Sequence, residues 1–261
     1  MNLTDQTILI TGGGSGIGLG LAEAFEKLGN QVIIAGRSQS KLEMARAKGF
    51  ATLTVDMTSQ ESIEGLAKEA IQKFPALNCV IHNAGIMKNE KLSKGDNAEI
   101  ATDTVLTNML GPILLTSFLL PHFLKQKSAT IMTVTSGLAY VPLSMTPTYC
   151  ATKAGIHSYT ESLRFQMKDT AIEVKEIVPP YVQTHLMGER QAYDPNAMPL
   201  HEFIDEVMSI LKNNPEVDEI VVQRAAAFHQ ASFGGEASYR EIFKSRNEFF
   251  LNARKAEWDS M

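Results

Sequence analysis

The chain has 261 residues, of which 44% are hydrophobic and 20% are charged, and its formal net charge is −5. This composition is typical of a globular protein that is long enough to bury a sizeable core. The acidic balance gives no support for binding to nucleic acid or to an anionic membrane surface. The two cysteines, Cys79 and Cys150, have no metal-binding or redox spacing. We therefore expect free thiols, no metal centre and a cytoplasmic location.

The sequence gives two reasons to expect no membrane association. It does not begin with a basic stretch followed by an apolar core and a small-residue cleavage site, so no secretory signal is expected. The longest strongly apolar run, 109–120, is interrupted by Gly111 and Pro112 and is too short to span a bilayer.

Apolar runs and helical patterns alternate along the chain. Short, β-prone apolar runs predict strands at 7–10, 31–35, 51–55, 78–82, 130–135, 172–178 and 219–222. Helical periodicity predicts helices at 17–28, 40–48, 59–74, about 100–125, 148–167 and 200–213. Such alternation is typical of an α/β fold in which helices cover both faces of a doubly wound parallel sheet. No interdomain linker is apparent, so we expect a single Rossmann-type domain over 1–261.

Three segments fall outside this alternation. The polar stretch 88–99 has the composition of a surface loop. The segment 184–199 has no periodicity, and with the following helix it forms an expected substrate-lobe insertion at about 184–214. The tail at about 238–258 is amphipathic and predicts an additional C-terminal helix.

A glycine-rich turn follows the first predicted strand and precedes a helix. Its glycines, Gly12, Gly16 and Gly18, have the spacing Gly-x-x-x-Gly-x-Gly. Glycines let a backbone approach the phosphates of a dinucleotide, and the helix N-terminus supplies N–H donors and a positive dipole. A glycine-rich turn can also serve purely steric needs, but its place between strand and helix is the context that phosphate binding requires.

The end of the second predicted strand indicates which dinucleotide is bound. An acidic residue there would accept hydrogen bonds from a ribose 2′-hydroxyl and favour NAD. The chain has Gly36 there instead, followed by Arg37 and Ser38. Arg37 can donate two hydrogen bonds to a 2′-phosphate, and Ser38 can donate another. The sequence therefore predicts NADP(H), with NAD less favoured.

Tyr149 and Lys153 are four residues apart in a predicted helix, so their side chains share one face. A phenol has a pKa of about 10, and a neighbouring cation lowers it. Ser136, at the end of the 130–135 strand, adds a hydroxyl. Together these groups could handle a carbonyl oxygen and its proton. Taken alone, the same pair would more often be a packed ring and a solvated amine.

In this order, the motifs resemble those of the short-chain dehydrogenase/reductase family, and the resemblance covers nearly the whole chain. Within the family the sequence is similar to a bacterial branch often labelled DltE-like, through 136–139, 147–153 and 176–180. The matching residues are Thr11, Gly12, Gly16, Gly18, Asp56, Asn83, Ala84, Gly85, Asn108, Ser136, Tyr149, Lys153 and the segment 179–184.

The resemblance implies four catalytic residues. Tyr149 would exchange a proton with the carbonyl or alcohol oxygen, and Ser136 would polarise that oxygen. Lys153 would lower the Tyr149 pKa and bind the nicotinamide ribose. Asn108 would fix a water molecule in a proton relay. Because Pro112, four residues later, has no N–H, it would leave the Asn108 carbonyl free to bind that water.

The resemblance also implies the residues that hold the cofactor. Asp56 and Met57 would flank the adenine, Asn83 and Gly85 the adenosine ribose, and Val182 and Thr184 the carboxamide of the nicotinamide. The full expected set is Gly12, Ser15, Gly16, Ile17, Gly18, Arg37, Ser38, Asp56, Met57, Asn83, Ala84, Gly85, Tyr149, Lys153, Pro179, Val182 and Thr184.

We expect an oxidoreductase that transfers a hydride between NADP(H) and a small hydrophobic carbonyl or alcohol. Relatives in this family are usually homodimers or homotetramers through the helices at 100–125 and 148–167, so a homo-oligomer is expected. A lyase or isomerase on the same fold, or an NADPH-binding sensor, is an alternative. The apolar pocket is expected to be formed by Leu138, Tyr140, Val141, Leu143, Met145, Tyr181, Met187 and Met198.

Overall fold

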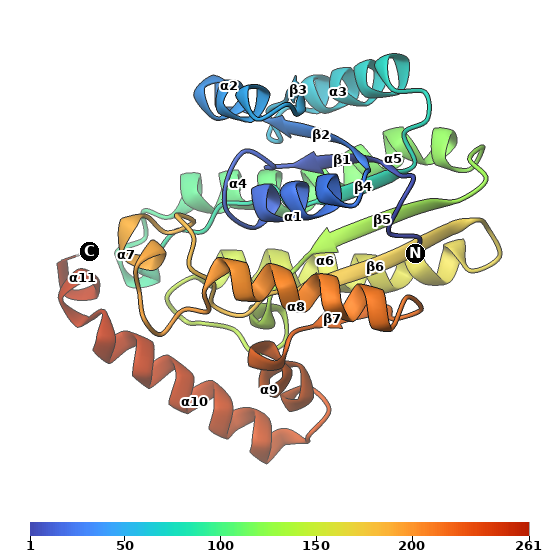
Figure 1. Cartoon of the computed structure of the whole chain (residues 1–261). Coiled ribbons are helices and arrows are strands. Elements are labelled where there is room, and N and C mark those ends of the chain that lie inside the picture. Colours follow the sequence, from blue (N-terminus) through green and yellow to red (C-terminus); the bar gives the residue numbers. More distant parts are fainter. Residues whose placement is uncertain (261) are drawn as a thin grey trace.

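The computed structural model describes residues 1–260 and is built on one parallel sheet (Figure 1). Its strand order is β3-β2-β1-β4-β5-β6-β7, and every neighbouring pair is parallel. This order confirms the predicted doubly wound α/β fold. The strands are β1 (Thr7–Thr11), β2 (Gln31–Gly36), β3 (Ala51–Thr54), β4 (Cys79–His82), β5 (Ala129–Val134), β6 (Ile172–Val178) and β7 (Glu219–Val221).

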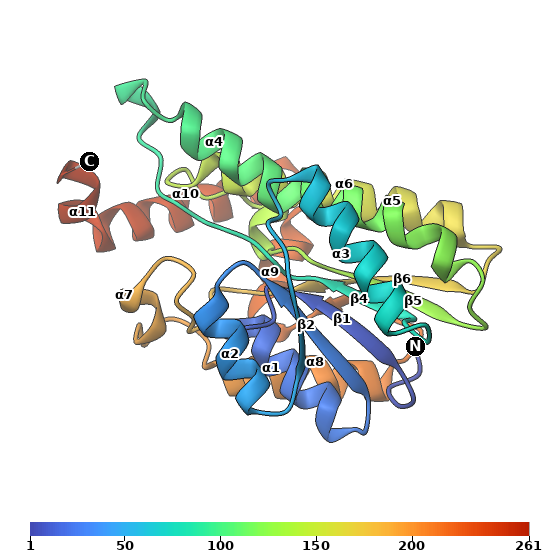
Figure 2. The same cartoon turned by 90° about the horizontal axis from the view of Figure 1, so that it is seen from above.

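Helices cover both faces of the sheet (Figure 2). The strands are apolar on both sides, so Ile8 and Ile10 belong to one core cluster while Leu9 belongs to the other. The first face is covered by α1 (Gly16–Lys27), α2 (Gln39–Ala47), α8 (Leu200–Asn213) and α9 (Gln223–Ala231). The second is covered by α3 (Gln60–Lys73), α5 (Gly111–Phe123) and α6 (Pro147–Met167).

The long helix predicted at 100–125 is present but is not regular. It consists of α4 (Ala98–Val105), a π-helical turn (Leu106–Leu110) and α5. Pro112 follows the π turn and cannot donate the i→i−4 hydrogen bond, which accounts for the irregularity at this point. A π turn inside a helix frequently marks a functional site.

The same helical stretch, Ala98–Phe123, is long and apolar enough to cross a membrane by length and composition alone. The apolar run at 109–120 is therefore part of a longer continuous helix, which includes α4 and α5. Leu115, Leu119 and Phe123 are fully buried against the sheet. We interpret the stretch as a core helix of this fold.

The segment expected to form a substrate lobe divides into two parts. Residues 184–199 stand outside the sheet and contain the short helix α7 (Glu189–Ala192). Helix α8 instead belongs to the sheet's own helical layer, with Phe203, Ile204 and Val207 buried in its core. A Cβ on Gly20 of α1 would lie 2.7 Å from Ile204, which shows how closely the two helices pack.

The C-terminal region differs from the prediction of one helix at about 238–258. It forms α10 (Glu236–Ala253) and the shorter α11 (Lys255–Ser260), after the unpredicted α9. The break falls at Arg254, whose buried guanidinium donates to the Tyr181 hydroxyl at 3.1 Å. Figure 1 shows α10 running along the side of the molecule beside α9. Cys79 and Cys150 are both free and buried, as expected.

Candidate active site

A cleft of about 470 Å³ lies at the carboxyl ends of the strands. Its walls come from the turns after β1, β2, β3, β4, β5 and β6, together with the start of α6. The strand order changes direction between β1 and β4, and ligands of open α/β sheets bind at such a switch point. All predicted site residues except Gly18 and Asn108 line this cleft.

The glycine turn after β1 forms the floor of the cleft. Gly12 and Gly16 have φ values of +66° and +55°, a left-handed conformation that glycine adopts without strain. Leu19 N bonds to Ser15 O, so α1 begins directly at the turn and directs its free N–H groups into the cleft. These donors and the bare backbone fit the pyrophosphate of a dinucleotide.

Gly18 lies in the first turn of α1 and faces Asn83 and the Gly12 backbone. A Cβ there would lie 2.4 Å from Asn83 Nδ2 and 2.6 Å from the Gly12 carbonyl oxygen. Asn83 Nδ2 itself donates to the carbonyls of Thr11 and Gly12 at 3.1 and 3.2 Å, which ties the turn after β4 to the turn after β1. Gly18 therefore permits close packing between α1 and the turn, and it does not contact the cleft.

Two cationic side chains, Arg37 and Lys41, lie near the end of β2, and Gly36 at the end of this strand contributes no carboxylate. Arg37 and Ser38 both line the cleft, as predicted. Ser38 also caps α2, because its side chain accepts from Lys41 N. Lys41, which was not predicted, lines the cleft and donates to Ser15 Oγ at 3.1 Å. Lys41 lies in the first turn of α2, four residues after Arg37, and this spacing is the sequence feature that could have identified Lys41 as a cleft residue.

Asp56 follows β3, the strand that pairs with β2, and lines the same cleft. Its Oδ1 accepts from the Thr58 backbone N–H at 2.9 Å and from the Thr58 hydroxyl at 2.8 Å. These two hydrogen bonds lower the pKa of Asp56, so the carboxylate is ionised at neutral pH. Met57 and Thr58 also line the cleft.

Ser136, Tyr149 and Lys153 meet at the inner end of the cleft, and each is at most 7% exposed. Tyr149 lies in the first turn of α6, where Pro147 occupies a position that needs no N–H donor. Lys153 Nζ donates to the Val134 carbonyl at 2.7 Å and lies 5.5 Å from the centroid of the Tyr149 ring.

Burial controls the proton affinities of these side chains. It raises the pKa of Tyr149, an effect that the nearby Cys150 thiol adds to and a hydrogen bond with Ser136 opposes. Burial lowers the pKa of Lys153 to about 8, against the opposite influence of the Glu176 carboxylate. Burial therefore outweighs the other influences on the Tyr149 pKa in the protein alone, and the lowering expected from Lys153 stays a prediction.

Asn108 is buried in the π turn and does not line the cleft, but its side chain bonds to segments that do. Its Oδ1 accepts from Ile86 N and its Nδ2 donates to Ile86 O, both at 2.8 Å. Nδ2 also lies 3.4 Å from the Thr152 hydroxyl on α6. The side chain thus joins the segment after β4 to the helix that carries Tyr149 and Lys153.

Two further residues of this region were not identified from the sequence. Glu90 belongs to the predicted surface loop but is 1% exposed, and it binds the backbone and the hydroxyl of Thr148 at the start of α6. Gln191 of α7 lines the cleft and donates to the Val182 carbonyl at 2.8 Å and to the Thr184 hydroxyl at 3.2 Å. Nothing in the local sequence distinguishes either residue from a solvated polar side chain.

An apolar cluster adjoins Tyr149 and includes part of the C-terminal helix. It consists of Leu138, Leu143, Met145, Tyr149, Cys150 and Phe250, with Met87, Tyr181, Leu251 and Trp258 packed against it. Phe250 comes from α10, whose Asn247 accepts from the Ser144 backbone N–H at 2.5 Å. The expected pocket is corrected at Tyr140, Val141 and Met198, which pack into the main core instead.

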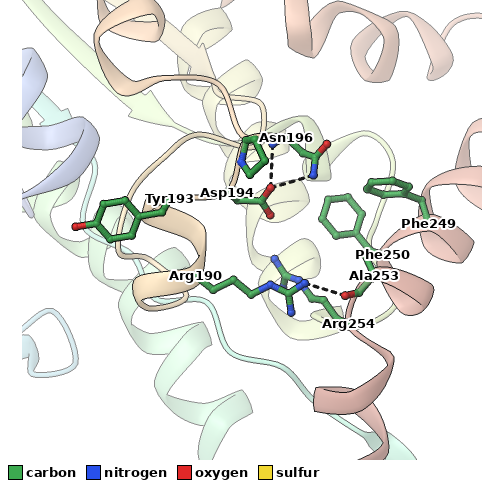
Figure 3. A pocket seen from close by; sticks show the side chains of 9 residues that line it. Arg190, Tyr193, Asp194, Asn196, Phe249, Phe250, Ala253 and Arg254 are labelled. Atoms are coloured by element: carbon green, nitrogen blue, oxygen red, sulfur yellow. Dashed lines mark hydrogen bonds between the residues drawn. The ribbon is translucent and has the colours of Figure 1, made fainter.

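A second cavity, of about 460 Å³, lies on the outer side of this cluster (Figure 3). It is bounded by residues 190–196 and by the end of α10, with Phe250 shared between the cavity and the cluster. The Arg190 guanidinium crosses it and donates to the Ala253 carbonyl at 2.8 Å. The end of α10 and the segment before α8 are thus in contact at this cavity.

The switch-point cleft, its glycine turn and the Ser136, Tyr149 and Lys153 group define a Rossmann-type oxidoreductase. The profile of the short chain dehydrogenase family matches residues 6–194. The chain belongs to this family, whose members act on CH–OH and C=O groups.

Similar proteins are found among both curated sequences and solved structures. The uncharacterized oxidoreductase DltE of Bacillus subtilis (strain 168) is 36% identical over 253 residues, which cover 95% of this chain and 98% of that protein. A short chain dehydrogenase from Burkholderia cenocepacia J2315 in complex with NADP has a TM-score of 0.79 at 22% identity, covering 95% of this chain and 99% of that one. A 3-ketoacyl-(acyl-carrier-protein) reductase from Brucella melitensis complexed with NADH has a TM-score of 0.76 at 23% identity, covering 86% and 100%.

Proposed function

We propose that the protein is an NADP(H)-dependent oxidoreductase that interconverts an apolar carbonyl compound and its alcohol. The observation that carries this proposal is the continuity of the cleft. A single cavity joins the glycine turn at Gly12 and Gly16 to Tyr149 and Lys153. A dinucleotide bound by its pyrophosphate at the turn would extend its reactive end toward the two buried side chains.

A nicotinamide cofactor is supported by the relatives of known structure, which carry NADP or NADH. The choice of NADP(H) rests on this chain's own residues. Arg37 and Lys41 place two cations at the end of β2, and Gly36 contributes no carboxylate to repel a 2′-phosphate. Arginine suits such a phosphate because its planar guanidinium can donate two parallel hydrogen bonds.

The cofactor supplies the hydride chemistry, and the protein supplies the proton and its placement. Tyr149 gives its phenolic proton to the carbonyl oxygen in reduction and removes one from the alcohol in oxidation. Ser136 donates a hydrogen bond to the same oxygen and keeps it beside the phenol. Lys153 would hold the ribose of the nicotinamide, and Asn108 would support a proton path to Lys153.

The cluster around Tyr149 supports the proposed substrate class. Leu138, Leu143 and Met145 are buried next to the phenol, and Phe250 closes the cluster from α10. Binding a carbonyl compound there would bury apolar surface of the substrate, at about 25 cal/mol for each Å². A hydrophobic aldehyde or ketone suits this environment, whereas a charged sugar would lose its hydration without a partner.

We also propose a homo-oligomer that acts in the cytoplasm. Phe165 on α6 is 70% exposed, and Leu110 and Leu124 at the two ends of α5 are 39% and 52% exposed. Exposed apolar side chains on these helices are consistent with an interface formed by α5 and α6 of two copies.

The experiment compares the two cofactors over a panel of aliphatic and aromatic aldehydes and ketones. We expect oxidation of NADPH with at least some panel members, and a kcat/KM with NADPH about 10-fold or more above that with NADH, because one charge-assisted contact contributes about 1.5–3 kcal/mol. Equal use of NADH would contradict the cofactor assignment. Tight NADPH binding without any turnover would instead favour a lyase, an isomerase or a sensor.

A further inference from the structure

Two glutamates, two histidines and a tyrosine form a polar cluster around His157, which lies about two turns after Tyr149 on α6. They come from five separate elements: Tyr140 follows a 3-10 turn (Gly137–Ala139), His157 lies on α6, Glu176 on β6, Glu219 on β7 and His229 on α9. Neither the cofactor cleft nor the cluster around Tyr149 includes any of them. The proposed reaction therefore uses none of them directly, although the Glu176 carboxylate opposes the lowering of the Lys153 pKa.

Their polar atoms lie within a few ångströms of one another. His157 Nδ1 is 2.9 Å from Glu176 Oε2, and the Tyr140 hydroxyl is 2.9 Å from Glu219 Oε2 and 3.4 Å from His157 Nδ1. One ligand atom from each of His157, Glu176 and Glu219 lies within 4.8 Å of the others. We propose that these three side chains bind a divalent transition-metal ion, Zn²⁺ or Mn²⁺.

The ligand set suits such an ion. Zn²⁺ binds imidazole nitrogen and carboxylate oxygen at about 2.0–2.2 Å, and three protein ligands with an open position are a common arrangement. Mn²⁺ accepts the same oxygen-rich set. Two carboxylates balance the charge of the ion. Without an ion, the side chain of Glu176, which has no exposed surface, is hydrogen-bonded to His157 and to the Thr135 hydroxyl, with Lys153 as a further nearby cation.

Outer hydrogen bonds orient the proposed ligands. The Thr135 hydroxyl donates to Glu176 Oε1 at 2.5 Å, which leaves Oε2 directed at His157. The second nitrogen of His157 faces the Glu161 carboxylate at 3.9 Å. Metal-binding histidines and carboxylates are held by partners of this kind.

His229 supports the third ligand and leaves a route for the ion. Its Nε2 lies 2.7 Å from Glu219 Oε2. The side chains of His157, Glu219 and His229 are 20%, 20% and 25% exposed, so an ion can reach the cluster from solvent. An ion there would join α6, β6 and β7, and through His229 also α9, which carries the chain toward α10.

The test measures metal binding on tag-free protein. After treatment with a chelator, the protein is titrated with Zn²⁺ and with Mn²⁺ by calorimetry, and the bound metal is counted after dialysis. We expect one equivalent to bind and the melting temperature to rise, because the ion binds only the folded chain. Co²⁺ in place of Zn²⁺ should give visible absorption bands of a four- or five-coordinate ion.

Two variants and a control assign the site. Glu219→Gln keeps the size and an acceptor for Tyr140 but loses the charge, and His157→Gln removes the imidazole. Each should weaken binding by about 100-fold or more, since loss of an outer partner alone costs about 10–100-fold. His201→Ala, at an exposed histidine on α8, should bind as the original chain does. Equal binding by all four proteins, or none by the original chain, would overturn the proposal.

Circular dichroism identifies any variant that fails to fold, and the Glu219→Gln protein then decides the result, because its substitution is isosteric and partly exposed. The outcome is independent of the proposed oxidoreductase activity, since stoichiometry and melting temperature are measured without cofactor or substrate.

Discussion

The carboxylate of Glu90 binds both the backbone N–H and the hydroxyl of Thr148, at 3.0 and 2.6 Å. Thr148 immediately precedes Tyr149, so an acidic side chain from the loop after β4 holds the first turn of the catalytic helix. The Glu90 N–H also donates to the Met145 carbonyl at 2.8 Å. The loop after β4 is thus fixed both to the start of α6 and to Met145 of the apolar cluster around Tyr149.

Replacing Glu90 with alanine should therefore destabilise the protein. The change leaves the N-terminus of α6 without its acidic partner, and we expect the free energy of unfolding to fall by about 1–3 kcal/mol. Urea denaturation measures this value. Asp96→Asn, at an exposed position of the same loop, is the control and should change stability by less than about 0.5 kcal/mol. Similar losses in both variants would show that Glu90 has no special role.

Arg37→Ala should separate the two cofactors. Loss of the guanidinium should raise the Kd for NADPH by about 10–100-fold, because a charge-assisted contact is removed, and should leave the Kd for NADH nearly unchanged. Fluorescence titration of reduced cofactor measures both constants. Arg46→Ala removes an exposed arginine from the far end of α2 and serves as the matched control. An unchanged NADPH affinity in Arg37→Ala would assign phosphate recognition elsewhere, with Lys41 the next residue to replace.

Lys153 should make stability depend on pH in a defined window. Its pKa is about 8 when folded and returns to about 10.5 on unfolding. Between these values the unfolded chain binds more protons, so the stability that Lys153 contributes rises with pH from about 8 to 10.5. The difference in unfolding free energy between the original chain and Lys153→Met should grow by up to about 1.4 kcal/mol for each pH unit in that window.

The measurement is urea denaturation of both proteins at several pH values between 7 and 10.5. Tyr149 and the other groups that change protonation are common to both chains, so they largely cancel in the difference. Parallel stability curves would mean that burial does not lower the Lys153 pKa.

Gly18→Ala tests the packing assigned to the third glycine of the turn. A Cβ there would lie 2.6 Å from the Gly12 carbonyl oxygen, and backbone cannot move aside as a flexible side chain can. We expect a loss of about 1–3 kcal/mol in stability together with weaker cofactor binding. Gly65→Ala, on α3 with no atom within 4 Å of the added methyl group, should be neutral or should stabilise by up to about 1 kcal/mol. Equal effects of the two changes would contradict this assignment.

The sequence predicts the sheet well because its strands are buried on both faces and therefore have continuous apolar runs, as in β4 and β5. It predicts most of the cleft residues because they follow closely on those strands, and it predicts Tyr149 and Lys153 because they are four residues apart on a helix. Helix α9 was not predicted, although Ala225, Phe228 and Ala231 recur at helical spacing, because the segment is short and uncharged residues dominate it.

Other features depend on contacts that no local pattern contains. The C-terminal helix ends at Arg254 without glycine or proline, because the side chain is drawn to Tyr181 and to the Met187 sulfur. From the sequence alone, Glu90 is expected to be a solvated charge. Its burial depends on the contact between the loop after β4 and Thr148 of α6. The proposed metal ligands are spread from residue 157 to residue 219, and the pairing of β6 with β7 brings two of them together.

The most direct test of the proposed chemistry is Tyr149→Phe, which removes one oxygen atom from the site and keeps the packed ring. With NADPH and a reactive aldehyde, we expect the rate of a single turnover to fall by about 10²–10⁴-fold, since the proton donor is lost, while the Kd for NADPH stays within about 2-fold. A variant that binds NADPH normally and still reduces the aldehyde at the original rate would contradict the assignment of Tyr149 as the acid and base of this site.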